Sequence, residues 1–87
     1  MIKIKAIKKA TTDMIEVTGI EFKEIQEKYP EISVSEFDQE NIDWSSKNVI
    51  GYIAGDIEGI LQKKRPEEVA DLWLVNKTYF DENYQEV

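Results

Sequence analysis

The sequence predicts an α+β fold, with a small antiparallel sheet of about four to five strands packed by a helix at about residues 19–29 and by a C-terminal helix. Short segments in which apolar and polar residues alternate have the period of half-buried strands. Between them, one segment repeats its apolar residues at helical spacing behind a capping signal. The chain has 87 residues, a length typical of a single domain.

The N-terminal segment predicts a hairpin. Residues 2–8 alternate apolar residues with lysines, which is the pattern of a half-buried strand. Lysines on its outer face suit an edge strand, because they discourage pairing with another chain. A polar turn at 11–13 separates it from a second apolar segment at 14–18, which we expect to pair antiparallel to the first strand.

A helix is predicted over residues 19–29. Thr18 and Glu21 have the spacing of a capping box, in which each side chain accepts from the other residue's backbone N–H. Three apolar residues then share one helical face: Phe22, Ile25 and Tyr29. Pro30 ends the helix, since proline lacks a backbone donor and restricts the residue before it.

The middle of the chain predicts three strands and a polar loop. Residues 31–37 alternate again and are expected to form a strand, followed by a polar, turn-rich loop at 38–48. Residues 49–54 are apolar and β-branched, as in a buried strand. An Asp-Ile-Glu-Gly sequence at 56–59 has the composition of a hairpin turn, which predicts a returning strand at 60–64.

The last 22 residues allow two interpretations. Pro66 followed by two glutamates is a helix start. The apolar run at 72–75 suits a buried strand over 72–76, and Thr78 has the character of a cap for a terminal helix at 79–85. We favour a helical turn, a strand and a helix. The alternative is one long helix over 66–85.

Composition excludes several classes of chemistry. The chain contains no histidine and no cysteine, which excludes cysteine or Ser–His nucleophiles, the usual zinc, haem and iron–sulfur ligands, and disulfides. Three glycines spaced four apart do not match a phosphate-binding loop, which requires lysine followed by serine or threonine. The sequence therefore predicts a protein that is not an enzyme and has no cofactor or metal.

Hydropathy predicts a soluble, cytoplasmic protein. The longest unbroken apolar run, at 72–75, is far shorter than the roughly 20 residues of a membrane span. The N-terminus is basic and alternating, without the apolar stretch of a signal peptide. The absence of cysteine agrees with a reducing compartment.

Acidic residues suggest a surface that contacts another protein. The chain has 18 acidic and 11 basic residues, for a formal net charge of −7, which argues against direct binding to nucleic acid or to a membrane surface. Lys47 is the only basic residue between positions 31 and 60. The candidate partner-binding residues are six of the seven acids of that segment together with its tryptophan: Glu36, Asp38, Glu40, Asp43, Trp44, Asp56 and Glu58.

Each feature of this set has a structural alternative. Blocks of like charge usually face water without a partner, and most tryptophans are largely buried, so Trp44 has the alternative of folding back as a lid on the core. The spacing of the acids between 36 and 43 does not fit a calcium loop, which needs a glycine at its sixth position. The segment is also too polar to raise the pKa of a carboxyl group by burial.

Several short motifs resemble those of a loosely related set of small phage and prophage proteins. The matching positions are Lys5-Ala6-Ile7, Glu58-Gly59, Trp73-Leu74-Val75 and the Phe80-to-Tyr84 ending. Where that set usually has Gly-Asp directly before the aromatic residue, this chain has Asp71-Leu72. The resemblance implies an α+β fold and a phage context, in which small acidic proteins bind host proteins and some inhibit defence nucleases, including RNA-guided ones, by mimicking nucleic acid.

These observations lead to two hypotheses. In the first, the chain is a non-enzymatic phage-type protein that binds a basic host protein, in its sharpest form a defence nuclease whose cationic channel it occupies (an anti-CRISPR-like role). In the second, it is a structural or assembly module that forms homo-oligomers through a strand edge or its terminal helix, with acids that only face water.

Overall fold

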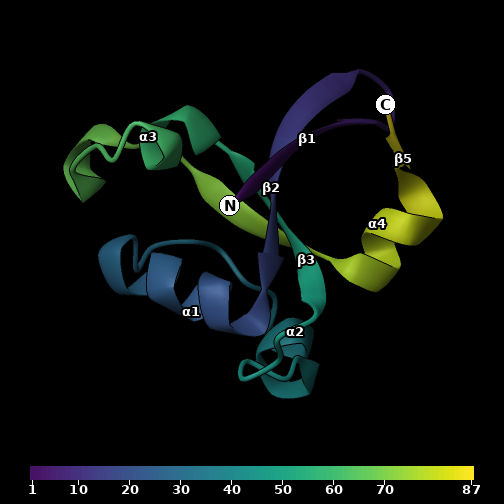
Figure 1. Cartoon of the computed structure of the whole chain (residues 1–87), viewed down its shortest axis with the longest axis horizontal. Helices are drawn as coiled ribbons and strands as arrows, with labels where there is room; N and C mark the ends of the chain where they lie inside the picture. The colour runs from purple at the N-terminus through teal and green to yellow at the C-terminus, as the bar shows by residue number, and fades with distance from the viewer.

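The computed structural model describes residues 1–87 and contains a five-stranded antiparallel sheet with four α-helices (Figure 1). The predicted α+β fold is thereby confirmed. The strands follow the order β4-β3-β2-β1-β5 across the sheet. The elements are β1 (Ile2–Ile7), β2 (Thr11–Thr18), α1 (Gly19–Lys28), α2 (Glu36–Asn41), β3 (Val49–Gly55), α3 (Ile57–Leu61), the 3₁₀ helix η1 (Pro66–Glu68), β4 (Leu72–Asn76), α4 (Lys77–Asn83) and β5 (Gln85–Glu86).

The sheet brings the two ends of the chain together. β1 and β2 form the predicted hairpin, with Ile2 opposite Glu16 and Ile7 opposite Thr11. β3 lies between β2 and β4. β5 pairs with the outer edge of β1, and the Val87 N–H donates to the Lys5 carbonyl at 2.9 Å. The edges of the sheet are therefore β4 on one side and β5 with the remainder of β1 on the other.

Each face of the sheet carries its own apolar cluster. α1 and α3 lie over one face and α4 over the other (Figure 1). The first cluster combines the inward residues of three strands with those of α1, α3 and the segment after α1: Ile15, Val17, Phe22, Ile25, Tyr29, Ile32, Ile53, Ile57, Ile60, Leu72 and Leu74. The second cluster lies beneath α4: Ile4, Ala6, Met14, Tyr52, Ala54, Val75 and Phe80. Because side chains alternate along a strand, β2, β3 and β4 contribute to both clusters.

The predicted capping box begins α1. The Thr18 hydroxyl accepts from the Glu21 N–H at 3.1 Å, and the Glu21 carboxylate accepts from the Thr18 N–H at 2.9 Å. The helix ends at Lys28, two residues before Pro30. Both predicted boundaries of this helix are confirmed within one residue.

The predicted strand at 31–37 is wrong. Only Ser33 pairs with the sheet, in a single parallel bridge to Trp73 of β4. The Ser35 hydroxyl then accepts from the Asp38 N–H at 3.1 Å and begins α2. A serine cap followed by acids in the first helical turn favours a helix start more strongly than the preceding alternation favours a strand.

The predicted hairpin turn at 56–59 and the returning strand at 60–64 are also wrong. Asp56 caps α3, and Ile57 and Ile60 are buried on one side of this short helix. The position next to β3 in the sheet is occupied by β4. The sequence Asp-x-x-Gly is compatible with a helix start as well as with a turn, and the spacing of the two isoleucines fits the helix.

The C-terminal segment forms a strand and a helix, not one long helix. η1 begins at Pro66, β4 covers the predicted strand, and α4 follows β4 directly. The cap of α4 is Asn76, not Thr78, because the Asn76 side-chain oxygen accepts from the Tyr79 N–H at 2.7 Å. α4 therefore begins two residues earlier than predicted.

Gly55 allows the chain to leave β3 beside the turn into β4. Its φ is 102°, a value that favours glycine. A Cβ atom at this position would lie 2.1 Å from the Asp71 carbonyl oxygen. No other residue type fits here without a backbone shift.

Candidate functional site

The seven candidate partner-binding residues do not form one surface. Five of them, from Glu36 to Trp44, lie on α2 and the loop after it, whereas Asp56 caps α3 and Glu58 lies within α3. In Figure 1, α2 lies at the bottom of the view and α3 at the upper left. The predicted surface is therefore divided between two separate parts of the molecule.

Asp38 is buried and has a structural role. Only 5% of its surface is exposed. Its carboxylate accepts from the Asn76 side-chain amide at 2.9 Å, which fastens α2 to the end of β4. Asp38 is therefore not part of the exposed surface that the sequence predicted.

Asp56 and Glu58 are also engaged within the molecule. The Asp56 carboxylate accepts from the Ala70 N–H at 3.0 Å and from the Gly59 N–H at 3.4 Å. Glu58 forms an ion pair with Lys3 at 3.1 Å. These two acids stabilise α3 and its contact with β1, and they add little free charge to the surface.

Trp44 folds back as a lid on the first apolar cluster. Its ring centroid lies 5.0 Å from that of Phe22, and its indole N–H donates to the Gln39 carbonyl at 3.4 Å. The Lys23 ammonium lies 5.7 Å from the centroid of the Trp44 ring. Packing therefore accounts for this tryptophan, as in the structural alternative.

Three of the predicted acids remain exposed and unpaired. Glu36 and Glu40 on α2 and Asp43 after it are exposed and form no ion pair. Hydrogen bonds from the Ser45 hydroxyl and N–H lower the pKa of the Asp43 carboxyl. Asp43 is therefore a fixed negative charge at neutral pH.

An exposed aromatic residue that the sequence analysis did not single out lies among these acids. Phe37 on α2 is 69% exposed. It lines an open groove of about 560 Å³ between α2, the start of β3 and α4. The apolar side chains of this groove are Phe37, Ile42, Ile50 and Tyr79. Its charged lining residues are Asp43 and Glu82 at the rim, the buried Asp38, and Lys77. We call Glu36, Phe37, Glu40, Asp43, Tyr79 and Glu82 the α2 surface.

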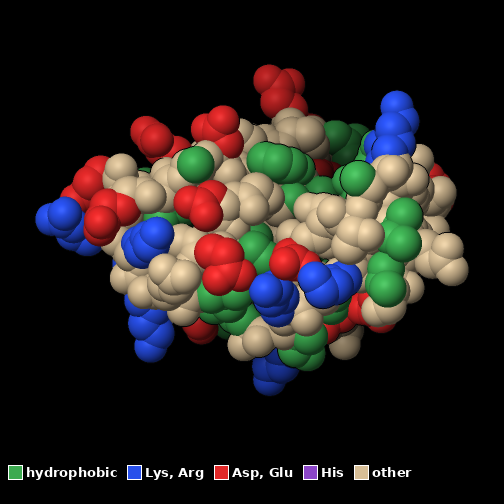
Figure 2. Space-filling view, turned by 90° about the horizontal axis from the view of Figure 1, so that it is seen from above, with side chains coloured by type: hydrophobic (Ala, Val, Ile, Leu, Met, Phe, Trp, Pro, Cys, Tyr) green, Lys and Arg blue, Asp and Glu red, His purple; other side chains and the backbone are tan.

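On the face shown in Figure 2, acidic and basic side chains lie beside one another. In the view of Figure 2, from above the orientation of Figure 1, acidic side chains are interspersed with lysine and arginine. On the β1–β2 hairpin, Asp13 contacts Lys5 at 3.1 Å and Lys3 at 3.4 Å. The hydrogen bond from Lys5, followed by that from Lys3, lowers the pKa of the Asp13 carboxyl. Asp13 on this hairpin is therefore paired with two lysines, whereas Glu36, Glu40 and Asp43 form no ion pair.

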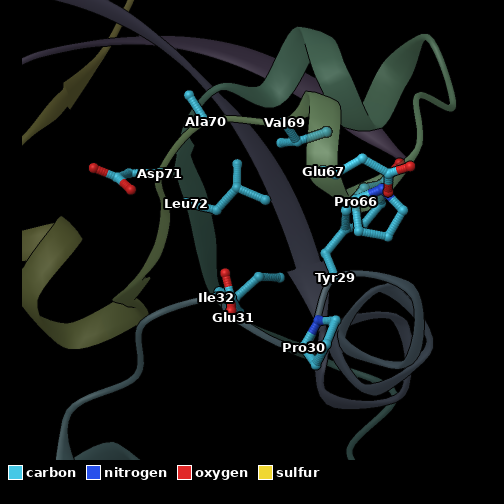
Figure 3. A pocket seen from close by; sticks show the side chains of 10 residues that line it. All are labelled: Tyr29, Pro30, Glu31, Ile32, Pro66, Glu67, Val69, Ala70, Asp71 and Leu72. Atoms are coloured by element: carbon cyan, nitrogen blue, oxygen red, sulfur yellow. The ribbon is translucent and has the colours of Figure 1, made fainter.

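A second groove, of about 400 Å³, lies between the end of α1 and η1 (Figure 3). We call it the proline groove, because Pro30 and Pro66 stand on its two sides. Its other lining residues are Tyr29, Glu31, Ile32, Glu67, Val69, Ala70, Asp71 and Leu72. The Tyr29 hydroxyl donates to the Lys64 carbonyl at 2.7 Å, which joins the two sides of the groove.

No group of three or more acidic residues lies close enough together to hold a metal ion. No helix is long and apolar enough to cross a membrane. The exposed features that stand out are the α2 surface and the proline groove.

The chain matches no protein-family model, no curated protein and no solved structure.

Proposed function

We propose that this protein is a non-enzymatic binding protein whose α2 surface docks on a basic region of a partner protein. The observation that carries the proposal is Phe37, which is 69% exposed on a helix flanked by the unpaired carboxylates of Glu36 and Glu40. A large aromatic side chain left in water costs free energy that burial against a partner recovers.

The surroundings of Phe37 suit a protein interface. Tyr79 is 42% exposed on the opposite side of the groove, and aromatic side chains are enriched at interface centres. Acids around an apolar centre increase the rate of association with a basic partner and add specificity more than affinity. The groove has an apolar centre with acids at its rim, and its one lining cation, Lys77, is paired with Asp81 at 2.9 Å. The Lys8 ammonium lies 4.9 Å from the centroid of the Tyr79 ring.

The sharpest form of the proposal is inhibition of a host enzyme that processes nucleic acid, such as a defence nuclease. A basic channel that normally receives phosphates would accept carboxylates in their place. The formal net charge of −7 supports this form, as does the resemblance to phage proteins noted in the sequence.

The experiment is affinity capture from a bacterial lysate at low and high salt, with variants of the bait. We expect one basic protein to be captured by the wild type, less of it at high salt, and none by Phe37→Ser or by Glu36→Lys with Glu40→Lys. The matched control is Glu24→Lys with Glu27→Lys, which reverses two exposed acids of α1. Capture that survives the α2 variants, or that the α1 control abolishes equally, contradicts the proposal.

A second candidate function is assembly of the chain with itself. β5 covers the outer edge of β1 only near Ala6 and Ile7, and Ile2 at the other end of β1 is 60% exposed. Open strand edges are templates for pairing. Light scattering distinguishes the two candidates, since the assembly module requires a stable oligomer and the binding protein is expected to be a monomer in the absence of its partner.

A further inference from the structure

We infer that the proline groove binds a short segment of a partner protein in which an aliphatic side chain is next to a lysine or an arginine. The inference goes beyond the proposed function, because it concerns a different surface. Its basis is the combination of an apolar floor, acidic sides without a lining cation, and a rigid frame.

The floor of the groove is apolar. Ile32 and Leu72 are buried members of the first apolar cluster, and Val69 packs against it half-buried. In Figure 3, Val69 and Leu72 lie between Glu67 and Asp71, which stand at opposite ends of the view. A volume of about 400 Å³ is within the range of small ligand sites and accommodates a few side chains.

The charge of the groove selects for a cation. Three carboxylates line it and no lysine or arginine does. Glu67 is paired with Arg65 at 3.4 Å, whereas Glu31 and Asp71 form no ion pair. A lysine or arginine of a bound segment would supply the missing countercharge, while its aliphatic neighbour would cover the floor. An acidic segment would be repelled.

The groove is already formed without a ligand. Three hydrogen bonds hold its frame. The Tyr29 hydroxyl donates to the Lys64 carbonyl, and the Ile32 N–H donates to the Tyr29 carbonyl at 3.3 Å. The Ala70 N–H donates to the Asp56 carboxylate. Pro30 and Pro66 restrict the backbone on both sides. A pre-organised site loses little conformational entropy when it binds.

The test is a titration of ¹⁵N-labelled protein with the capped peptide Arg-Leu-Arg-Leu, followed by NMR, and with Glu-Leu-Glu-Leu as the matched probe. We expect saturable shifts of the Ile32, Val69 and Leu72 amides with the basic peptide and none with the acidic one. Glu31→Lys with Asp71→Lys should raise the dissociation constant about tenfold or more. Both positions are exposed, and an unchanged circular dichroism spectrum will show that the variant folds.

The control variant is Glu36→Lys with Glu40→Lys, which changes the α2 surface and should leave this titration unchanged. Shifts confined to the α2 surface, equal shifts with both peptides, or affinity unaffected by Glu31→Lys with Asp71→Lys would each overturn the inference. Shifts of the groove amides that depend on protein concentration without peptide would instead assign the groove to a second copy of this chain. Failure here leaves the capture experiment on α2 unaffected, so the two proposals fail separately.

Discussion

At the scale of single residues, Asn76 joins three elements through one side chain. It ends β4, its oxygen caps α4 at the Tyr79 N–H, and its amide group donates to the buried carboxylate of Asp38 on α2. Nothing in the local sequence relates positions 38 and 76. This long-range contact explains why Asp38 was predicted to be a surface acid and is instead part of the framework.

Removal of the Asp38 carboxylate should destabilise the protein. Asp38→Ala leaves the Asn76 amide without its acceptor in a poorly solvated site, and we expect a loss of about 1–3 kcal/mol in the free energy of unfolding. The measurement is urea denaturation. Glu40→Ala, at an exposed position of the same helix, is the control and should change stability by less than about 0.5 kcal/mol. Equal effects of the two substitutions would contradict the structural role of Asp38.

A substitution at Gly55 should also be costly. Gly55→Ala places a methyl group against the Asp71 carbonyl and requires a φ of 102° from an alanine, and strain of this kind costs about 1–3 kcal/mol. Ala10→Ser in the exposed β1–β2 turn is the matched control and should be nearly neutral. Thermal unfolding followed by circular dichroism measures both, and an undiminished melting temperature for Gly55→Ala would contradict the described turn.

At the scale of elements, helices and strands with an unambiguous local sequence signal were predicted correctly. The capping box, the alternation at 2–8 and the apolar runs at 49–54 and 72–76 each correspond to an element of the structure. The wrong predictions came from short sequence patterns that are compatible with two different secondary structures. Alternation at 31–37 continued into α2, which begins after its serine cap, and an Asp-x-x-Gly sequence began α3 instead of a hairpin. Tertiary packing decides which of the two secondary structures forms, and these contacts cannot be read from a single sequence.

The caps of α1 and α4 provide a paired test at this scale. Thr18→Ala removes the acceptor for the Glu21 N–H, and we expect a loss of about 1 kcal/mol in stability. Thr78→Ala should be close to neutral, because Asn76 is the cap of α4. Both variants can be compared by chemical denaturation. A larger effect at Thr78 than at Thr18 would contradict these assignments.

At the scale of the whole molecule, the candidate site depends on how distant segments meet. The sequence predicted three surface acids that the structure also exposes: Glu36, Glu40 and Asp43. Phe37 was assigned to a strand, so its place at the centre of these acids was not predicted. Tyr79 and Glu82 join them only because α4 folds back beside α2. The composition of the sequence indicates that such a surface is acidic, but the fold determines which residues come together in it.

The ion pairs on the β1–β2 hairpin predict how stability depends on pH. The lysine contacts hold the folded-state pKa of Asp13 below its ordinary value of 3.8, so the carboxylate stabilises the fold above that pH. This contribution is lost as the pH falls through the lowered folded-state pKa. We expect Asp13→Asn to lose less stability than the wild type between pH 5 and pH 2, measured by urea denaturation at low salt. An identical pH dependence would contradict this role.

The central position of β3 has a consequence for hydrogen exchange. β2 and β4 flank this strand, and apolar clusters cover it on both faces. Its amide protons should exchange with deuterium only when the whole molecule unfolds, whereas those of β5 should exchange through local fraying. Exchange measured by NMR under native conditions would thus report the global free energy of unfolding at Tyr52 and Ile53.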